Sequence, residues 1–81
     1  MNVVFESIPV VDQVFFNPQS NEIHVLIAGI EFALPLSKIP EEDFESASPI
    51  LGFSIGCEGA VVVCKHRDGA ETWLPADMWL P

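Results

Sequence analysis

The side chains with the widest chemical range in this sequence are Cys64 and His66, two residues apart in a predicted strand. Residues i and i+2 of a strand point to the same face, and a hairpin turn at Asp68-Gly69 would bring Glu71 opposite His66. A thiol, a base and an acid together have the composition of a nucleophilic site. Such sites usually gather groups from separate parts of a fold, and the sequence has no phosphate loop, nucleophile elbow or HExxH motif. We therefore expect no enzyme activity and keep a small enzyme using Cys64 and His66 as the last alternative.

Metal binding would have to draw on Cys57, Cys64, His66 and His24. A structural zinc site uses four Cys or His ligands, commonly in closely spaced pairs, and no CxxC motif or neighbouring pair of histidines is present. We expect no metal and no cofactor. Cys57 and Cys64 should be free thiols, because the cytoplasm keeps cysteines reduced. Cys64 then acts as a small buried hydrophobe, and His66 pairs with Glu71 across the hairpin.

The sharpest charge feature is the acidic run Glu41, Glu42, Asp43 and Glu45, in a chain whose formal net charge is −9. Affinity for nucleic acids and anionic membranes comes from Lys and Arg, so we expect neither kind of binding. A basic surface on a protein partner is electrostatically favoured. The run also has a structural explanation, because acids at the start of a predicted helix are stabilised by its dipole.

The C-terminal stretch is rich in large side chains: Trp73, Met78 and Trp79. Tryptophan and methionine are enriched at protein interfaces, and they serve equally well as covers for the thin core of a small domain. Pro75 fits the first position of one short helical turn through Trp79.

The elements that would position these residues are mainly hairpins. Residues 22–27 and 30–36 both alternate between apolar and polar residues, and a two-residue turn at Ala28-Gly29 places Ile27 opposite Ile30. In this register the alternating apolar side chains of both strands lie on the same face of the hairpin. A shift of the pairing by one residue would move those of one strand to the opposite face.

A second hairpin is predicted from residues 60–67 and 70–74, with a two-residue turn at Asp68-Gly69. This turn pairs Cys64 with Trp73 and Val63 with Leu74. Both faces of the hairpin are then apolar near its open end. The second face needs a cover, either from the short helix and the C-terminal residues or from a partner, and this favours a homodimer.

Further strands are predicted over 10–16 and 51–55, and residues 3–7 form either a separate short strand or the start of the first. A two-turn helix is predicted over 40–47, begun by Pro40 and ended by Pro49. The predicted fold class is α+β: a small antiparallel β-sheet of about five to six strands in hairpins, with one short helix near residues 40–47. The chain of 81 residues should be a single domain, 1–81. No internal repeat, targeting segment or membrane-length apolar run is visible, so we expect a cytoplasmic location.

Part of the chain resembles the bacterial domain-of-unknown-function family 2442. The similarity lies mainly in residues 16–59 and rests on Asn17-Pro18, the strand 22–27, Gly29, the segment 34–40, Ala47, Phe53 and Gly59. The C-terminal part departs from the family, since Asp68-Gly69 and residues 73–80 replace its Trp-Pro and acidic pair. The resemblance implies a curved antiparallel sheet with one main helix and no established catalytic residues. Some members of the family are associated with two-gene toxin–antitoxin pairs.

These observations predict a small acidic protein-interaction module of a bacterium, which binds another protein or itself. A more specific hypothesis is an antitoxin-like or mobile-element accessory protein. The first alternative is a nucleic-acid mimic that inhibits a DNA-binding enzyme, which requires the carboxylates to converge on one face at phosphate-like spacing. The candidate partner-binding residues are Trp73, Trp79, Met78, Glu41, Glu42, Asp43 and Glu45.

Overall fold

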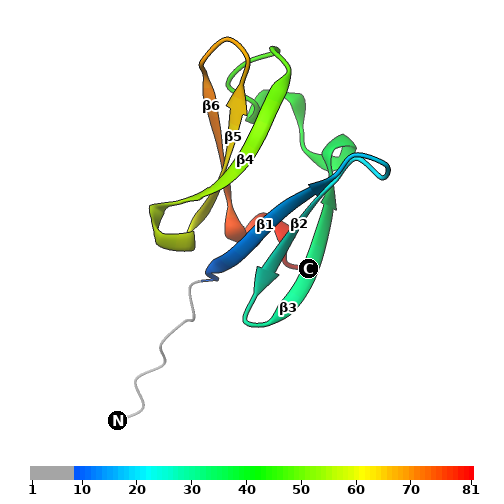
Figure 1. The fold of residues 1–81 in the computed structure, drawn as a ribbon, viewed down its shortest axis with the longest axis vertical. Helices are drawn as coiled ribbons and strands as arrows, with labels where there is room; N and C mark the ends of the chain where they lie inside the picture. The colour runs from blue at the N-terminus through cyan, green and yellow to red at the C-terminus, as the bar shows by residue number, and fades with distance from the viewer. Residues whose placement is uncertain (1–8) are drawn as a thin grey trace.

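The computed structural model describes residues 9–81, which form six antiparallel strands in two three-stranded sheets (Figure 1). The first sheet contains β1 (Val11–Asn17), β2 (Glu22–Ile27) and β3 (Ile30–Pro35), and the second contains β4 (Ile50–Gly56), β5 (Val61–His66) and β6 (Glu71–Pro75). Four short 3-10 turns complete the structure: η1 (Leu36–Lys38), η2 (Glu41–Asp43), η3 (Cys57–Gly59) and η4 (Ala76–Trp79). The strand suggested for residues 3–7 lies outside the described residues.

The predicted antiparallel hairpins are confirmed, whereas the α+β class is not. The prediction was one sheet of about five to six strands with a helix. Residues 9–81 instead form two separate three-stranded sheets, and their helical elements are short 3-10 turns. The first hairpin has the predicted register, with Ile27 opposite Ile30 and Val25 opposite Phe32. No helix of the described part is long and apolar enough to cross a membrane.

The helix predicted over residues 40–47 is reduced to the single turn η2. Phe44 already has extended backbone angles (φ −87°, ψ 131°), so the helical path ends there. Beyond it, the N–H of Glu45 donates to the Thr72 hydroxyl, and the N–H of Ser48 donates to the Ser46 hydroxyl. Serine side chains that bond to the backbone compete with helical hydrogen bonds. A segment this short between two prolines also gains too few helical bonds to offset helix nucleation.

The second half of the chain repeats the architecture of the first. β1 and β4 each have seven residues, β2 and β5 each have six, and both first strands carry a bulge at their second residue. Each third strand ends in Leu-Pro and leads into a 3-10 turn. The N–H that follows this proline donates to the carbonyl just before the middle strand in both halves, from Leu36 to Asn21 (3.0 Å) and from Ala76 to Ala60 (2.9 Å).

This repetition is hidden in the sequence because the matching strands have few residues in common. Glu31, Leu34 and Pro35 of β3 recur as Glu71, Leu74 and Pro75 of β6. Residues at matching positions of β1 and β4, and of β2 and β5, differ throughout. What the two halves share is the alternation of inward and outward side chains, and many different apolar residues satisfy that pattern.

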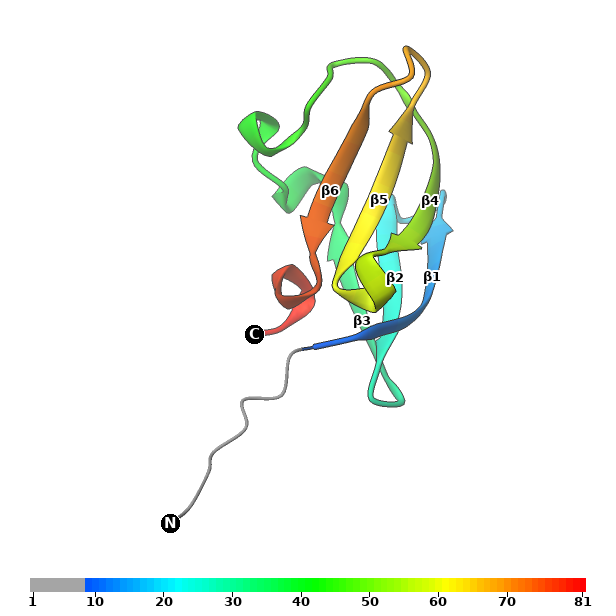
Figure 2. The ribbon, with the colours of Figure 1, turned by 90° about the vertical axis from the view of Figure 1, so that its left-hand side faces the viewer.

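The two sheets pack their inner faces together, with the second sheet in front of the first in Figure 2. The fully buried centre is formed by Ile23 and Val25 of β2, Val62 and Cys64 of β5, and Leu74 of β6. Along one side β1 lies beside β4, and on the other side η4 packs against β3. Trp79 of η4 is only 5 % exposed, and its indole N–H donates to the carbonyl of Ile23 (2.9 Å). The C-terminal turn thus fastens the second half of the chain onto the first sheet.

The two tryptophans should differ in their contribution to stability, because Trp79 is buried and Trp73 is 55 % exposed. We expect Trp79→Ala to lower the free energy of unfolding by about 3–5 kcal/mol, and Trp73→Ala by less than about 1 kcal/mol. Urea unfolding followed by far-UV circular dichroism measures both. Equal losses for the two variants would contradict the packing described above.

Candidate functional site

The hairpin that carries most of the candidate residues has a different register from the predicted one. The amide of His66 donates to the carbonyl of Ala70 (2.9 Å), and the amide of Gly69 donates to the carbonyl of His66 (3.0 Å). The turn therefore contains three residues, 67–69, and Gly69 adopts the left-handed conformation (φ 93°) that such turns require. Cys64 pairs with Thr72 rather than with Trp73.

This one-residue difference turns every side chain of β6 to the opposite face. Thr72 and Leu74 join Val62, Cys64 and His66 on the inner face, where all five are buried. Glu71 and Trp73 instead share the outer face with Lys65, and the Trp73 indole N–H donates to the Glu71 carboxylate (3.2 Å). The predicted pairing of His66 with Glu71, and the trio of these two with Cys64, are therefore wrong.

The two cysteines have different surroundings in residues 9–81. Cys64 is fully buried, and desolvation raises the pKa of its thiol to about 11, so the reactive thiolate is disfavoured near neutral pH. Cys57 is an exposed free thiol at the start of η3. Within the described part of the chain, no group of three or more His, Cys, Asp and Glu side chains is arranged to hold a metal ion.

His66 and Thr72 instead form a buried hydrogen-bond network. His66 Nδ1 lies 2.8 Å from the carbonyl oxygen of Ser48, which can only accept, so this nitrogen donates. In the neutral ring Nε2 then accepts from the Thr72 hydroxyl (2.7 Å), and the Thr72 oxygen accepts the N–H of Glu45 (2.9 Å). With this tautomer both ring nitrogens, the hydroxyl and the two backbone groups have partners.

The network holds the crossover segment, residues 36–49, which joins the two sheets. At the equivalent positions of the first half stand the hydrocarbon side chains Ile27 and Phe32. The polar pair is therefore specific to the second half, where it binds the crossover segment. Asp68 adds a second attachment, because its carboxylate accepts a hydrogen bond from the Ser46 hydroxyl and its amide donates to Ser48 Oγ (3.2 Å).

These bonds shape a hollow of about 610 Å³ between the crossover segment and the end of the second sheet, which we call the crossover groove. Its apolar side chains are Phe44, Ala47, Pro49 and Ile50, and its acidic side chains are Glu41 and Glu45. The ring of His66 forms part of the wall and meets Phe44 edge-on, with ring centroids 6.4 Å apart. The groove therefore combines an apolar lining with carboxylates.

The carboxylates near the crossover groove have no cationic side chain within ion-pair distance among residues 9–81. Elsewhere, Glu22 and Glu31 lie within 3.5 and 3.2 Å of the nitrogens of His24, and Glu71 lies 3.9 Å from Lys65. These are the ion pairs found in residues 9–81, so none involves the run Glu41, Glu42, Asp43 and Glu45, whose residues are all exposed. Since η2 is a single turn, a helix dipole offers this run little stabilisation.

The predicted partner-binding residues thus separate into three places. Glu41 and Glu45 line the crossover groove, with Glu42 and Asp43 beside them, and Trp73 lies on the outer face of the second sheet. Trp79 belongs to the core, and Met78 packs against it. Sequence reasoning missed Phe44 and His66 as groove residues, although the apolar Phe44 inside an acidic run was a usable signal.

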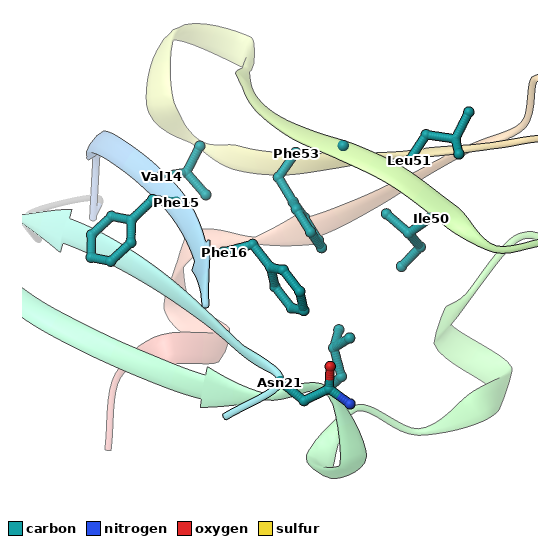
Figure 3. Close-up of a pocket in the computed structure, with 9 residues that line it drawn as sticks. Val14, Phe15, Phe16, Asn21, Ile50, Leu51 and Phe53 are labelled. Carbon is teal, nitrogen blue, oxygen red and sulfur yellow. The ribbon is translucent and has the colours of Figure 1, made fainter. Parts of the chain in front are cut away.

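A second hollow, of about 510 Å³, lies at the seam between β1 and β4 (Figure 3). Phe16 and Phe53 point into it and stack with their ring centroids 5.1 Å apart, while Ile50 and Leu51 point to opposite sides of β4. Asn21 is the polar side chain of its lining, and no charged side chain contributes. This seam therefore lacks the combination of features that distinguishes the crossover groove.

Removing the Thr72 hydroxyl should loosen the crossover segment. Thr72→Val keeps the shape of the side chain but leaves His66 Nε2 and the N–H of Glu45 without partners, so we expect a loss of about 1–3 kcal/mol in the free energy of unfolding. Urea unfolding measures the loss, and amide hydrogen exchange at Glu45 should become faster. Ser54→Ala, an exposed hydroxyl on the outer face, is the control and should change stability by less than about 0.5 kcal/mol. An unchanged Thr72→Val variant would contradict the network.

Asp68 should make stability depend on pH in the acid range. The hydrogen bond from Ser46, followed by that from the Ala70 amide, lowers the pKa of Asp68 below its usual value of 3.8. Its stabilising contribution is therefore fully present above that value and is lost as the pH falls through the lowered pKa. The stability difference between the wild type and Asp68→Asn, measured from about pH 2 to about pH 7, should shrink towards the acid end. A difference that stays constant over this range would refute the assignment.

Comparisons with known proteins identify no relative of this chain. No protein-family model, curated protein or solved structure matches the chain. The function of the crossover groove must therefore be argued from its own residues.

Proposed function

We propose that this chain is a small acidic protein-interaction module that binds a basic and partly apolar segment of another protein in the crossover groove. The observation that carries the proposal is the position of unpaired carboxylates, Glu41 and Glu45, beside the apolar side chains of Phe44 and Ile50.

The chemistry of the groove suits lysine and arginine side chains. These residues carry a long hydrocarbon stem and a charged end, so the stem can lie against Phe44 and Ile50 while the charge reaches Glu41 or Glu45. An aromatic ring such as that of Phe44 also attracts a cation over its face. A volume of about 610 Å³ is ample for one or two side chains of a partner.

The charge of the whole chain supports the same partner. A net charge of −9 attracts a basic protein and speeds the encounter, and salt should weaken both effects. In the more specific antitoxin-like hypothesis, the basic segment belongs to a toxin that is produced together with this chain.

The nucleic-acid mimic has less support. Its carboxylates would have to follow one another along a single face, whereas the exposed acids lie on separate elements, such as Asp12 in β1, Glu58 in η3 and Asp77 in η4. The cluster at residues 41–45 is compact and adjoins an apolar hollow, which fits a side-chain pocket better than a phosphate backbone.

A peptide-binding experiment tests the proposed function. The probe is a fluorescent peptide of about six residues in which arginine and leucine alternate, and the control peptide has glutamate in place of arginine. We expect the basic peptide to bind and the acidic one not to bind, as measured by fluorescence anisotropy. Phe44→Ala should weaken binding of the basic peptide by about tenfold, since it removes apolar contact area.

Charge variants then locate the site. Glu41→Gln and Glu45→Gln should each weaken binding by about two- to fivefold, the usual contribution of an exposed ion pair. Asp77→Asn removes one negative charge in η4, outside the groove, and should change affinity by less than about twofold. An equal effect of all three variants would show a general charge attraction and overturn the groove as the binding site.

A further inference from the structure

The outer face of the second sheet is a separate surface, formed by residues that point away from the core. Strand pairing places Gly52, Ser54 and Gly56 of β4, Val61, Val63 and Lys65 of β5, and Glu71, Trp73 and Pro75 of β6 on this face. Val63 is only 7 % exposed but does not belong to the core cluster, which confirms that it is covered from the outer side.

On this face β4 carries small residues and β6 carries larger ones. Gly56 has no side chain, and a Cβ there would lie 2.7 Å from a methyl group of Val63 and 3.1 Å from one of Val61, so the valines extend over this position. On the opposite side Trp73, 55 % exposed, lies directly across from Val63. An exposed tryptophan beside aliphatic residues is the composition of an interface centre.

The charges of this face are balanced, unlike those of the chain as a whole. Lys65 and Glu71 are its charged residues, and their side chains are 65 % and 43 % exposed. Their separation of 3.9 Å within one chain is at the limit of an ion pair, and both side chains are exposed enough to meet charges of a second copy. Two copies of a chain with a net charge of −9 repel each other, and a neutral face is where that repulsion is smallest.

The residues are also arranged so that the face is complementary to itself. Lys65 lies across from Glu71, Val63 across from Trp73 and Val61 across from Pro75. A twofold axis that runs along the strands, between β5 and β6, would place each residue of these pairs against its counterpart in a second copy. Lys65 then meets the second copy's Glu71, Trp73 lies over the second copy's β5, and each contact occurs twice, as in an isologous interface.

We infer that the outer face of the second sheet is the dimer interface of this protein, and that its occupant is a second copy packed face to face through Trp73 and the Lys65–Glu71 pairs. This goes beyond the proposed binding of a basic segment, because the crossover groove lies on another surface and uses other residues. A three-stranded face about 14 Å wide is small for a stable complex, so the dimer should be weak and reversible, with a dissociation constant in the micromolar range.

Sedimentation equilibrium over a range of protein concentrations tests the inference. We expect a reversible monomer–dimer equilibrium for the wild type and a dissociation constant raised by at least about tenfold in Trp73→Ala. Ile30→Ala is the matched control, because Ile30 is an equally exposed apolar residue (59 %) in the first sheet, and it should leave the equilibrium unchanged. A wild type that is monomeric at every concentration, or equal effects of the two variants, would overturn the inference.

A charge-swap cycle provides a second test that does not depend on Trp73. Lys65→Glu and Glu71→Lys should each weaken the dimer, since like charges would then meet across the twofold axis, and the double variant should return to within about threefold of the wild type. Unfolding of each variant, followed in urea, separates this effect from stability of the single chain. A double variant as weak as the single ones would refute the arrangement.

Salt distinguishes the two proposals. Added salt screens both the repulsion between two acidic chains and the Lys65–Glu71 attractions between them, so dimerisation should depend only weakly on salt, whereas binding of the basic peptide to the crossover groove should weaken steeply. A dimer that loses affinity with salt as steeply as the peptide complex does would contradict the neutral interface, and this outcome leaves the peptide experiment unaffected.

Discussion

The structure depends on the mutual burial of two apolar sheet faces. A three-stranded sheet of this size has one face that must leave water, and it cannot bury that face alone. Here each half of the chain builds one such sheet and covers the other half. The centre of the resulting core is made of β-branched and aliphatic side chains such as Ile23, Val25, Val62 and Leu74, all with at most 1 % exposure. Neither half would keep its shape without the other, although the two have the same architecture.

Hydrogen bonds from side chains connect the two halves where backbone groups are buried. The indole N–H of Trp79 satisfies a backbone carbonyl of β2, and the pair His66 and Thr72 satisfies backbone groups of the crossover segment. A loop has no ladder of strand hydrogen bonds, so its buried backbone groups need side-chain partners. The first half of the chain has Ile27 and Phe32 at the same two positions. A difference between two otherwise equivalent halves therefore marks the place where the crossover groove is formed.

The crossover groove and the outer face of the second sheet differ in their charge and in their side chains. The crossover groove is acidic and concave, and its carboxylates have no cationic partner among residues 9–81. The outer face of the second sheet carries the exposed Trp73 and the oppositely charged Lys65 and Glu71. A single small domain can thus offer one surface to a basic partner and another to its own copy. Binding at one surface leaves the other accessible, since Trp73 and Glu45 lie on different faces.

The sequence alone determined the strands and the first hairpin, because alternation and a two-residue turn at Ala28-Gly29 agree on one register. It could not determine the second register, since Asp68-Gly69 suits both a two-residue and a three-residue turn, and only burial of Thr72 and Leu74 against the other sheet selects the longer one. The helix over 40–47 failed for a similar reason, because the N–H of Glu45 donates to the Thr72 hydroxyl and the N–H of Ser48 to the Ser46 hydroxyl in place of helical bonds. Tertiary packing therefore decided which face carries Trp73, where the carboxylates gather, and that two halves without a visible repeat share one architecture.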